Sequence, residues 1–273
     1  MLIRSLSGIV LVAVLVLSIF WSMKSFGFLW WLISFVAFYE IYSMDSRPGR
    51  STGYFCGSSI FLTMTLVGVL TKEISFFYGS MIMTPLVYLL VEMLSYKSGQ
   101  GYAELGTKAV GFLLLSYVSL GFGSVFALTL QDWPIYLLLF LFSVNWLQDT
   151  FAYVGGRLIG RTVFSANLSP KKTWEGAFIG FIGAVGLWIY LGFNFSQLVV
   201  PELLNSFALI TVIVAIAGQL GDLLESYFKR SLGVKDSGRV IPGHGGVLDR
   251  FDSVILSGFV LLFSLIFTRL NSL

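Results

Sequence analysis

Residues Ser226 to Asp252 read SYFKRSLGVKDSGRVIPGHGGVLDRFD, a polar and glycine-rich stretch that lies between two long apolar runs. The whole chain of 273 residues is 56% hydrophobic and only 11% charged. In a soluble domain about a quarter of the residues are charged. The contrast predicts that the flanking runs lie in lipid and that the polar stretch lies outside it, where chemistry is to be sought.

Apolar runs that are long enough to cross a hydrocarbon core of about 30 Å recur along the chain. Because lipid offers the backbone no hydrogen-bond partner, these runs are expected to be helices. We therefore expect an all-α, polytopic integral membrane protein with about nine transmembrane helices and an active site at the cytoplasmic side. The expected spans are Leu6–Met23, Phe26–Tyr42, Tyr54–Leu70, Ile74–Leu94, Ala109–Leu130, Trp133–Leu147, Gly176–Phe193, Phe207–Leu224 and Ser253–Thr268.

The first run follows Arg4 and has a secretory signal peptide as its alternative interpretation. Similar runs follow it to the end of the chain, and no small-x-small cleavage site comes after it. Both observations favour a first membrane span.

The basic residues predict the orientation. If nine spans alternate between two sides, 14 of the 17 Lys and Arg residues fall on the side of the N-terminus, and the exceptions are Lys24, Lys72 and Arg269. The positive-inside rule then places the N-terminus and the polar stretch in the cytoplasm. A net charge of +3 gives no reason to expect nucleic acid as a partner, whereas basic loops beside a membrane suit anionic lipid head groups.

The chain is expected to have two parts. Residues 1–130 hold about five spans, and residues 131–273 hold about four, with polar motifs at 145–176 and 218–252. In the first part, Glu40 and Glu92 are interpreted as interfacial acids that meet water, and a place in a site is the alternative for either of them. Trp30 is interpreted as an interface anchor.

The motif 145–176 reads NWLQDTFAYVGGRLIGRTVFSANLSPKKTWEG. Asp149 lies where the sixth span leaves the membrane, and ionisable groups at such depth are usually functional. Ser169 or Thr173 is expected to cap the seventh span, with Pro170 in its first turn. Lys171 and Lys172 can contact phosphate oxygens near that helix end, and an ordinary positive-inside anchor is the alternative.

Carboxylates gather around the central stretch. Asp222 and Glu225 share a helix face with Ser226 at the end of the eighth span. Acids at this end oppose the helix dipole, which favours a bound cation over a solvated helix end. Asp249 and Asp252 are one helical turn apart at the start of the ninth span. With a single cysteine, Cys56, and a single histidine, these acids and Asp149 predict Mg²⁺ rather than zinc.

Basic residues and glycines complete the central stretch. Lys229, Arg230, Lys235 and Arg239 carry enough positive charge to offset a polyphosphate. The turn Pro242-Gly243-His244-Gly245-Gly246 exposes backbone N–H groups that can cradle a phosphate, and His244 is assigned to substrate contact or loop geometry. Acids, bases and such a turn beside a membrane indicate phosphoryl or nucleotidyl transfer on a lipid. Walker A, GxSxG and HExxH motifs are absent from the sequence.

The pattern S-x-F-K-R-x4-K-D-x-G-x2-I-P-x-H-G-G-V-x-D-R-F-D, from Ser226 to Asp252, resembles the signature of the phosphatidate cytidylyltransferases (CDP-diacylglycerol synthases) without a departure. The segments D-T-x-A-Y, from Asp149, and S-P-K-K-T-x-E-G, from Ser169, are similar to a second motif region of that family. These motifs cover less than a third of the chain, all in its second half.

The resemblance implies an enzyme of phospholipid biosynthesis that joins CTP and phosphatidate into CDP-diacylglycerol and releases pyrophosphate. It implies Mg²⁺ dependence with a site on Asp222 and Asp249, a second cation as a further expectation, a homodimer, and the cytoplasmic (inner) membrane as the location. A CTP-dependent lipid or polyprenol kinase and, from another class, an ion transporter remain as alternatives.

Both lines of reasoning assign roles to the same residues. The catalytic candidates are Asp222, Asp249, Lys229, Arg230 and Lys235. The substrate-binding candidates are Lys171, Lys172, Ser226, Arg239, His244, Gly245, Gly246 and Arg250. The metal-binding candidates are Asp222, Asp249, Asp149, Glu225 and Asp252.

Overall fold

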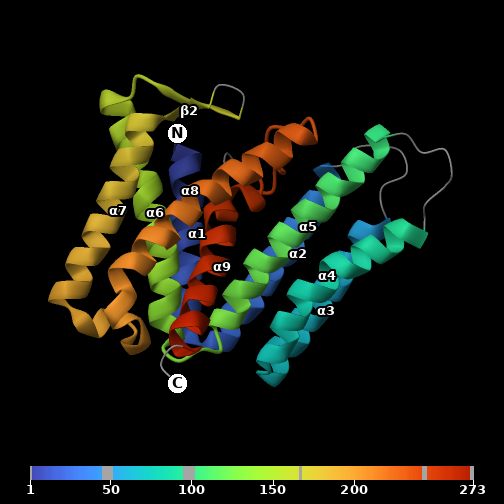
Figure 1. Cartoon of the computed structure of the whole chain (residues 1–273), viewed down its shortest axis with the longest axis horizontal. Helices are drawn as coiled ribbons and strands as arrows, with labels where there is room; N and C mark the ends of the chain where they lie inside the picture. Colours follow the sequence, from blue (N-terminus) through green and yellow to red (C-terminus); the bar gives the residue numbers. More distant parts are fainter. Residues whose placement is uncertain (1, 45–51, 95–101, 166–167, 242–244, 271–273) are drawn as a thin grey trace. The chain divides into compact units, whose positions relative to one another are not determined.

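The computed structural model describes residues 2–44, 52–94, 102–165, 168–241 and 245–270. Nine α-helices account for most of this described chain: α1 Leu2–Trp21, α2 Met23–Met44, α3 Thr52–Thr71, α4 Ile74–Leu94, α5 Tyr102–Leu128, α6 Pro134–Ile159, α7 Trp174–Asn194, α8 Phe207–Ser231 and α9 Leu248–Leu270. A two-stranded antiparallel hairpin, β1 Val163–Ser165 and β2 Ser169–Thr173, precedes α7, and the 3-10 turns Ser196–Leu198 and Pro201–Ser206 follow it (Figure 1).

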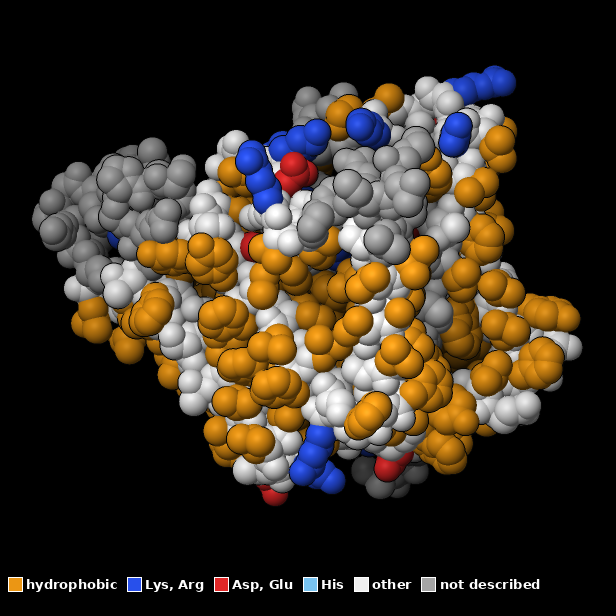
Figure 2. Space-filling view, turned by 180° about the vertical axis from the view of Figure 1, so that it is seen from behind, with side chains coloured by type: hydrophobic (Ala, Val, Ile, Leu, Met, Phe, Trp, Pro, Cys, Tyr) orange, Lys and Arg blue, Asp and Glu red, His pale blue; other side chains and the backbone are white. Residues whose placement is uncertain are grey.

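The helices confirm the prediction of an all-α, multi-pass membrane protein. By length and composition, eight helices of the described chain, α2 to α9, can cross a membrane, whereas the described apolar part of α1, Ser7–Trp21, is shorter. Hydrophobic side chains cover most of the surface that faces the viewer in Figure 2, and the few Lys, Arg, Asp and Glu side chains lie at its margins. Such a surface requires lipid to cover it.

Several helices extend beyond the predicted spans, and four of them do so by five residues or more. Helix α5 begins at Tyr102, α6 continues to Ile159, α8 continues to Ser231, and α9 begins at Leu248. Hydropathy finds the lipid-facing part of a helix, but backbone hydrogen bonding continues until a residue ends it. For α8 that residue is Gly233, at φ 75°, where the N–H of Gly233 donates to the carbonyl of Arg230 and the N–H of Val234 to that of Lys229. This is a Schellman C-terminus, so Asp222 and Glu225 lie inside α8 rather than at its end.

The chain forms two compact units. The first unit comprises Met1–Leu130 and Phe228–Phe251, and the second comprises Gln131–Tyr227 and Asp252–Leu273. In the first unit Trp30 is fully buried, its ring lies 5.0 Å from those of Phe122 and Phe251, and its indole N–H donates to the Phe122 carbonyl at 3.2 Å. The interpretation of Trp30 as an interface anchor is therefore wrong, because the residue faces the core of its unit.

In the second unit α6 and α7 run side by side (Figure 1) and approach closely through glycines. A Cβ atom on Gly176 would lie 2.8 Å from the Ala152 carbonyl oxygen, and one on Gly180 would lie 2.6 Å from the Gln148 carbonyl oxygen. The sequence between them, G-A-F-I-G, has the GxxxG spacing of closely packed membrane helices.

Polar side chains link further helices of the second unit. The buried Asn145 donates from Nδ2 to Ser257 Oγ of α9 at 2.9 Å, and the buried Gln148 donates from Nε2 to the Ala215 carbonyl of α8 at 3.1 Å. Gln219 of α8 donates to the Ala177 carbonyl of α7 at 2.8 Å. Because these bonds form in apolar surroundings, they fix the helices of this unit relative to one another.

The glycine contact yields a prediction. Gly180→Ala should lower the midpoint of thermal unfolding of the purified protein in detergent, because the new methyl group displaces α7 from the α6 backbone, at a cost of about 1–3 kcal/mol. Gly186→Ala in the same helix is the matched control, since a Cβ atom there meets nothing within 4 Å. It should leave the midpoint unchanged or raise it, as alanine is the better helix former. Equal midpoints for the two variants would contradict the assigned packing.

Candidate functional site

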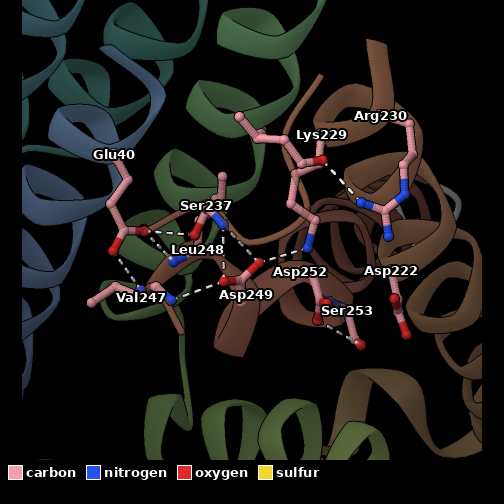
Figure 3. A network of polar contacts seen from close by, with 12 residues as sticks. Glu40, Asp222, Lys229, Arg230, Ser237, Val247, Leu248, Asp249, Asp252 and Ser253 are labelled. Carbon is pink, nitrogen blue, oxygen red and sulfur yellow. Dashed lines mark hydrogen bonds and ion pairs between the residues drawn. The ribbon is translucent and has the colours of Figure 1, made fainter. Parts of the chain in front are cut away.

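In the first unit, the end of α8 and the start of α9 are joined by a buried ion pair. Lys229 Nζ lies 2.6 Å from Asp249 Oδ1, and both residues are 8% exposed. Asp249 Oδ2 also accepts the backbone N–H groups of Ser237, at 3.0 Å, and Gly246, at 2.8 Å. One carboxylate thus binds the end of one helix and both sides of the loop between the helices (Figure 3).

A second carboxylate, Glu40 of α2, binds the same loop. Its Oε1 accepts the N–H of Val247 at 2.8 Å, and its Oε2 accepts the N–H of Leu248 and the hydroxyl of Ser237, both at 2.9 Å (Figure 3). Glu40 is 1% exposed, so its interpretation as an interfacial acid that meets water is wrong. The other acid interpreted in this way, Glu92, is paired with Lys108 at 3.1 Å.

Glycines make room for the two carboxylates. A Cβ atom on Gly238 or on Gly246 would lie 2.6 Å from a Glu40 carboxylate oxygen, and one on Gly245 would lie 2.7 Å from Asp249 Oδ2. Gly245 also has φ +86°, a conformation that glycine adopts without strain. The Ile241 N–H donates to the Gly245 carbonyl at 3.0 Å and closes the turn at its base. Residues 242–244, and with them the assignment of His244, lie outside the described residues.

Basic side chains of this segment lie at the surface. Lys235, Arg239 and Arg250 are exposed, as is Arg230, whose guanidinium donates to the Val234 carbonyl at 2.9 Å. The segment therefore combines a loop that is held by two buried carboxylates with cationic side chains that face solvent. This arrangement can bind a polyanion such as a chain of phosphates.

In the second unit the hairpin brings Lys172 of β2 to Asp222 of α8, and the two side chains form an ion pair. Glu175 shapes the hairpin by accepting the N–H groups of Arg161 and Thr162 and the Thr162 hydroxyl, at 2.9–3.2 Å. Lys171, next to the pair, is exposed.

The start of α7 decides between the two predicted caps. Thr173 is the cap, since its hydroxyl accepts the Gly176 N–H at 3.2 Å. Pro170 lies in β2 rather than in a first helical turn, which corrects that prediction. The polar sequence Ser-Pro-Lys-Lys-Thr pairs with β1 through its backbone, and the helix begins only after its last residue.

The remaining predicted acids take separate positions in the second unit. Asp149 is exposed on α6, Glu225 is 1% exposed on α8, and Asp252 of α9 is half-buried and accepts the Ser253 N–H at 2.6 Å. Ser226, also on α8, is half-buried. No group of three or more His, Cys, Asp or Glu side chains in the described part of the chain is arranged to hold a metal ion. The side chain of Asp222, the acid paired with Lys172, is 18% exposed.

From the sequence, a place for Glu40 in a site was only the alternative interpretation, and Ser237 was not predicted as part of this arrangement. The available signal was an ionisable residue inside an apolar run, which usually marks function. The partners of Glu40 lie about 200 positions later in the chain, and only the fold brings them together.

The ion pair between Lys229 and Asp249 gives a testable prediction. Asp249→Asn should lower the thermal midpoint markedly, because it leaves the buried Lys229 charge uncompensated, and breaking such a pair costs about 3–5 kcal/mol. The double variant Lys229→Met/Asp249→Asn should recover much of the loss, since it removes the orphaned charge as well. The measurement is a double-mutant cycle on thermal unfolding in detergent.

Asp132→Asn is the control for this cycle. Asp132 is 72% exposed and pairs with Arg269 at 2.9 Å, and exposed pairs contribute about 0–1 kcal/mol. If the double variant lost as much stability as the two single variants together, Lys229 and Asp249 would act independently, and this result would contradict the structure.

Comparison with known proteins identifies the family of the chain. The profile described as "Cytidylyltransferase family" matches residues 2–268 of the chain. A phosphatidate cytidylyltransferase of Staphylococcus saprophyticus is 44% identical over 147 residues, which are 52% of this chain and 54% of that protein. That of Rickettsia bellii is 32% identical over 194 residues, which are 69% of this chain and 84% of that protein. The chain thus matches about half the length of the staphylococcal relative and most of the rickettsial one. The chain belongs to the cytidylyltransferase family.

Proposed function

We propose that the chain transfers the cytidylyl group of CTP to phosphatidate, giving CDP-diacylglycerol and pyrophosphate. The observation that carries the proposal is the loop between α8 and α9, in which a glycine turn is held by two buried carboxylates while basic side chains face solvent. The names of the relatives, the uninterrupted signature from Ser226 to Asp252 and the family membership support it. The multi-pass membrane character suits a substrate whose acyl chains stay in the bilayer.

In the proposed reaction an oxygen of the phosphatidate phosphate attacks the α-phosphorus of CTP in line. A new P–O bond to that oxygen forms, the bond to the bridging oxygen of the β-phosphate breaks, and pyrophosphate carries away the electron pair. The attacking phosphate is already an anion near neutral pH, so the step requires no general base. We assign the exposed Arg230, Lys235, Arg239 and Arg250 of the first unit to offset the charge of the triphosphate. Lys171, which is exposed in the second unit, stays a candidate for substrate binding.

Lys172 is paired with Asp222 in the second unit, and Lys229 is paired with Asp249 in the first unit. A phosphate can therefore receive Lys172 or Lys229 only as the corresponding pair opens. The roles of Ser226, Gly245 and Gly246 in substrate binding also stay predictions. The backbone N–H of Gly246 already donates a hydrogen bond to Asp249.

We propose Mg²⁺ as the metal, with Asp222 as its principal ligand and Asp149, Glu225 and Asp252 of the same unit as candidates for further oxygen ligands. The chemistry of these donors suits the ion, because carboxylate oxygens are the hard ligands that Mg²⁺ prefers. The ion would replace the Lys172 ammonium at Asp222, and when bound it would neutralise charge on the phosphates. Asp249 as a ligand, and a second cation, stay predictions drawn from the resemblance.

The location proposed is the cytoplasmic membrane, with the N-terminus and the loop between α8 and α9 in the cytoplasm. The distribution of the Lys and Arg residues supports this orientation. The resemblance to bacterial enzymes of this family supports the cytoplasmic membrane. A homodimer stays a prediction of the resemblance.

The reaction can be tested with CTP that carries label at either the α- or the γ-phosphate. Purified protein in detergent with phosphatidate and Mg²⁺ should pass the α label to the lipid and release equimolar pyrophosphate. Passage of the γ label would identify a lipid kinase. Lipid free of both labels, from protein with a cooperative thermal transition, would refute transfer chemistry and leave the transporter alternative.

A second test addresses the metal. Asp222→Asn should abolish cytidylyl transfer, since the amide cannot replace the carboxylate as an anionic ligand, and should leave the thermal midpoint nearly unchanged because Asp222 is partly exposed. Asp132→Asn is the matched control and should retain activity. Full turnover by Asp222→Asn at saturating CTP and Mg²⁺ would remove Asp222 from the metal site.

A further inference from the structure

We propose that Glu40 is a positioning residue for cytidylyl transfer, a role that rests on the proposed function. Glu40 belongs to α2, far in sequence from the signature, and its buried carboxylate touches the loop rather than the solvent. It acts through Ser237, Val247 and Leu248, the residues on either side of the glycine turn. It is therefore distinct from the groups that would contact phosphates.

The start of α9 explains why an outside carboxylate is needed. The first N–H groups of a helix have no partner within the helix, and a Ser, Thr, Asp or Asn at the capping position usually accepts one of them. Here the residue before the helix is Val247, which has no side-chain acceptor. Glu40 takes the N–H groups of both Val247 and Leu248, and a negative charge at this helix end is favoured by the helix dipole.

The opposite side of the loop is held by the same carboxylate. Ser237 donates its hydroxyl to Glu40 Oε2 and its backbone N–H to Asp249. Gly238 and Gly246 lie against the Glu40 carboxylate, where a Cβ atom would collide with it. Glu40 thus joins the chain that enters the turn to the chain that leaves it, and both to α2 (Figure 3).

The hydrogen bonds between the Glu40 carboxylate and the loop are sensitive to the loss of its charge. A glutamine at position 40 has one acceptor oxygen in place of two and turns an NH₂ group toward donors on the loop. An aspartate keeps both acceptors and the charge but is shorter by one methylene. We therefore expect Glu40→Gln to misplace the turn, and Glu40→Asp to restore part of what Glu40→Gln loses.

The test compares Glu40→Gln, Glu40→Asp and the control Glu92→Gln, each normalised to its folded fraction and assayed well below its thermal midpoint. Glu40→Gln should lower kcat/KM for CTP by on the order of a hundredfold, the effect of a misplacement of about 1 Å. Glu40→Asp should be intermediate, and Glu92→Gln should equal the wild type, because Glu92 pairs with Lys108 on α5. Wild-type kcat/KM in folded Glu40→Gln would overturn the proposal.

Hydrogen–deuterium exchange gives a readout that does not depend on activity. The amides of Val247 and Leu248 should exchange faster in Glu40→Gln than in the wild type. In Glu40→Asp the exchange rate should lie between these two, and in Glu92→Gln it should equal that of the wild type. Unchanged exchange in Glu40→Gln would show that Glu40 does not hold the turn. If the wild type transferred no cytidylyl group, the proposed function would be refuted. The exchange measurement would still show whether Glu40 holds Val247 and Leu248.

Discussion

The loop between α8 and α9 buries several backbone N–H groups in an otherwise apolar protein, and each of them requires a hydrogen-bond acceptor. Glycine-rich turns expose such groups, and a buried donor left without an acceptor costs about 1–3 kcal/mol. Two carboxylates meet this requirement, Glu40 from α2 and Asp249 from the first turn of α9. The position of the loop therefore depends on acids that water does not reach.

This requirement divides the acids of the chain into two kinds. Asp249 is bound by an ammonium group and two backbone N–H groups, so in this structure its charge is used to hold the loop. Asp222 is partly exposed and paired with a lysine of a surface hairpin. The lysine paired with Asp222 can be exchanged for an ion or a phosphate at a lower cost in free energy, because both side chains still meet water. The sequence shows both as acids near the ends of apolar runs and does not distinguish them.

The class of the protein could be predicted from composition, because continuous apolar runs of this length cross lipid as helices. The signature located the loop that the fold then organises. The limits of helices α6, α8 and α9 could not be read from hydropathy, since they are set by local terminators such as Gly233. Glu40 was misjudged for a different reason. Its role depends on contacts with residues about 200 positions away, and neither periodicity nor charge pattern carries that information.

The close approach of Gly238 and Gly246 to the Glu40 carboxylate has a consequence for how the sequence can vary. The atoms nearest to a methyl group at Gly238 would all belong to Glu40, so it needs space that a shorter acid at position 40 would leave. A methyl group at Gly246 would also lie 2.0 Å from Ser237 Oγ, so a shorter acid at position 40 is not enough there. Substitutions at positions 40 and 238 are therefore not independent, and an alanine at 238 that is harmful beside glutamate becomes tolerable beside aspartate. At position 246, alanine would further require a change at Ser237.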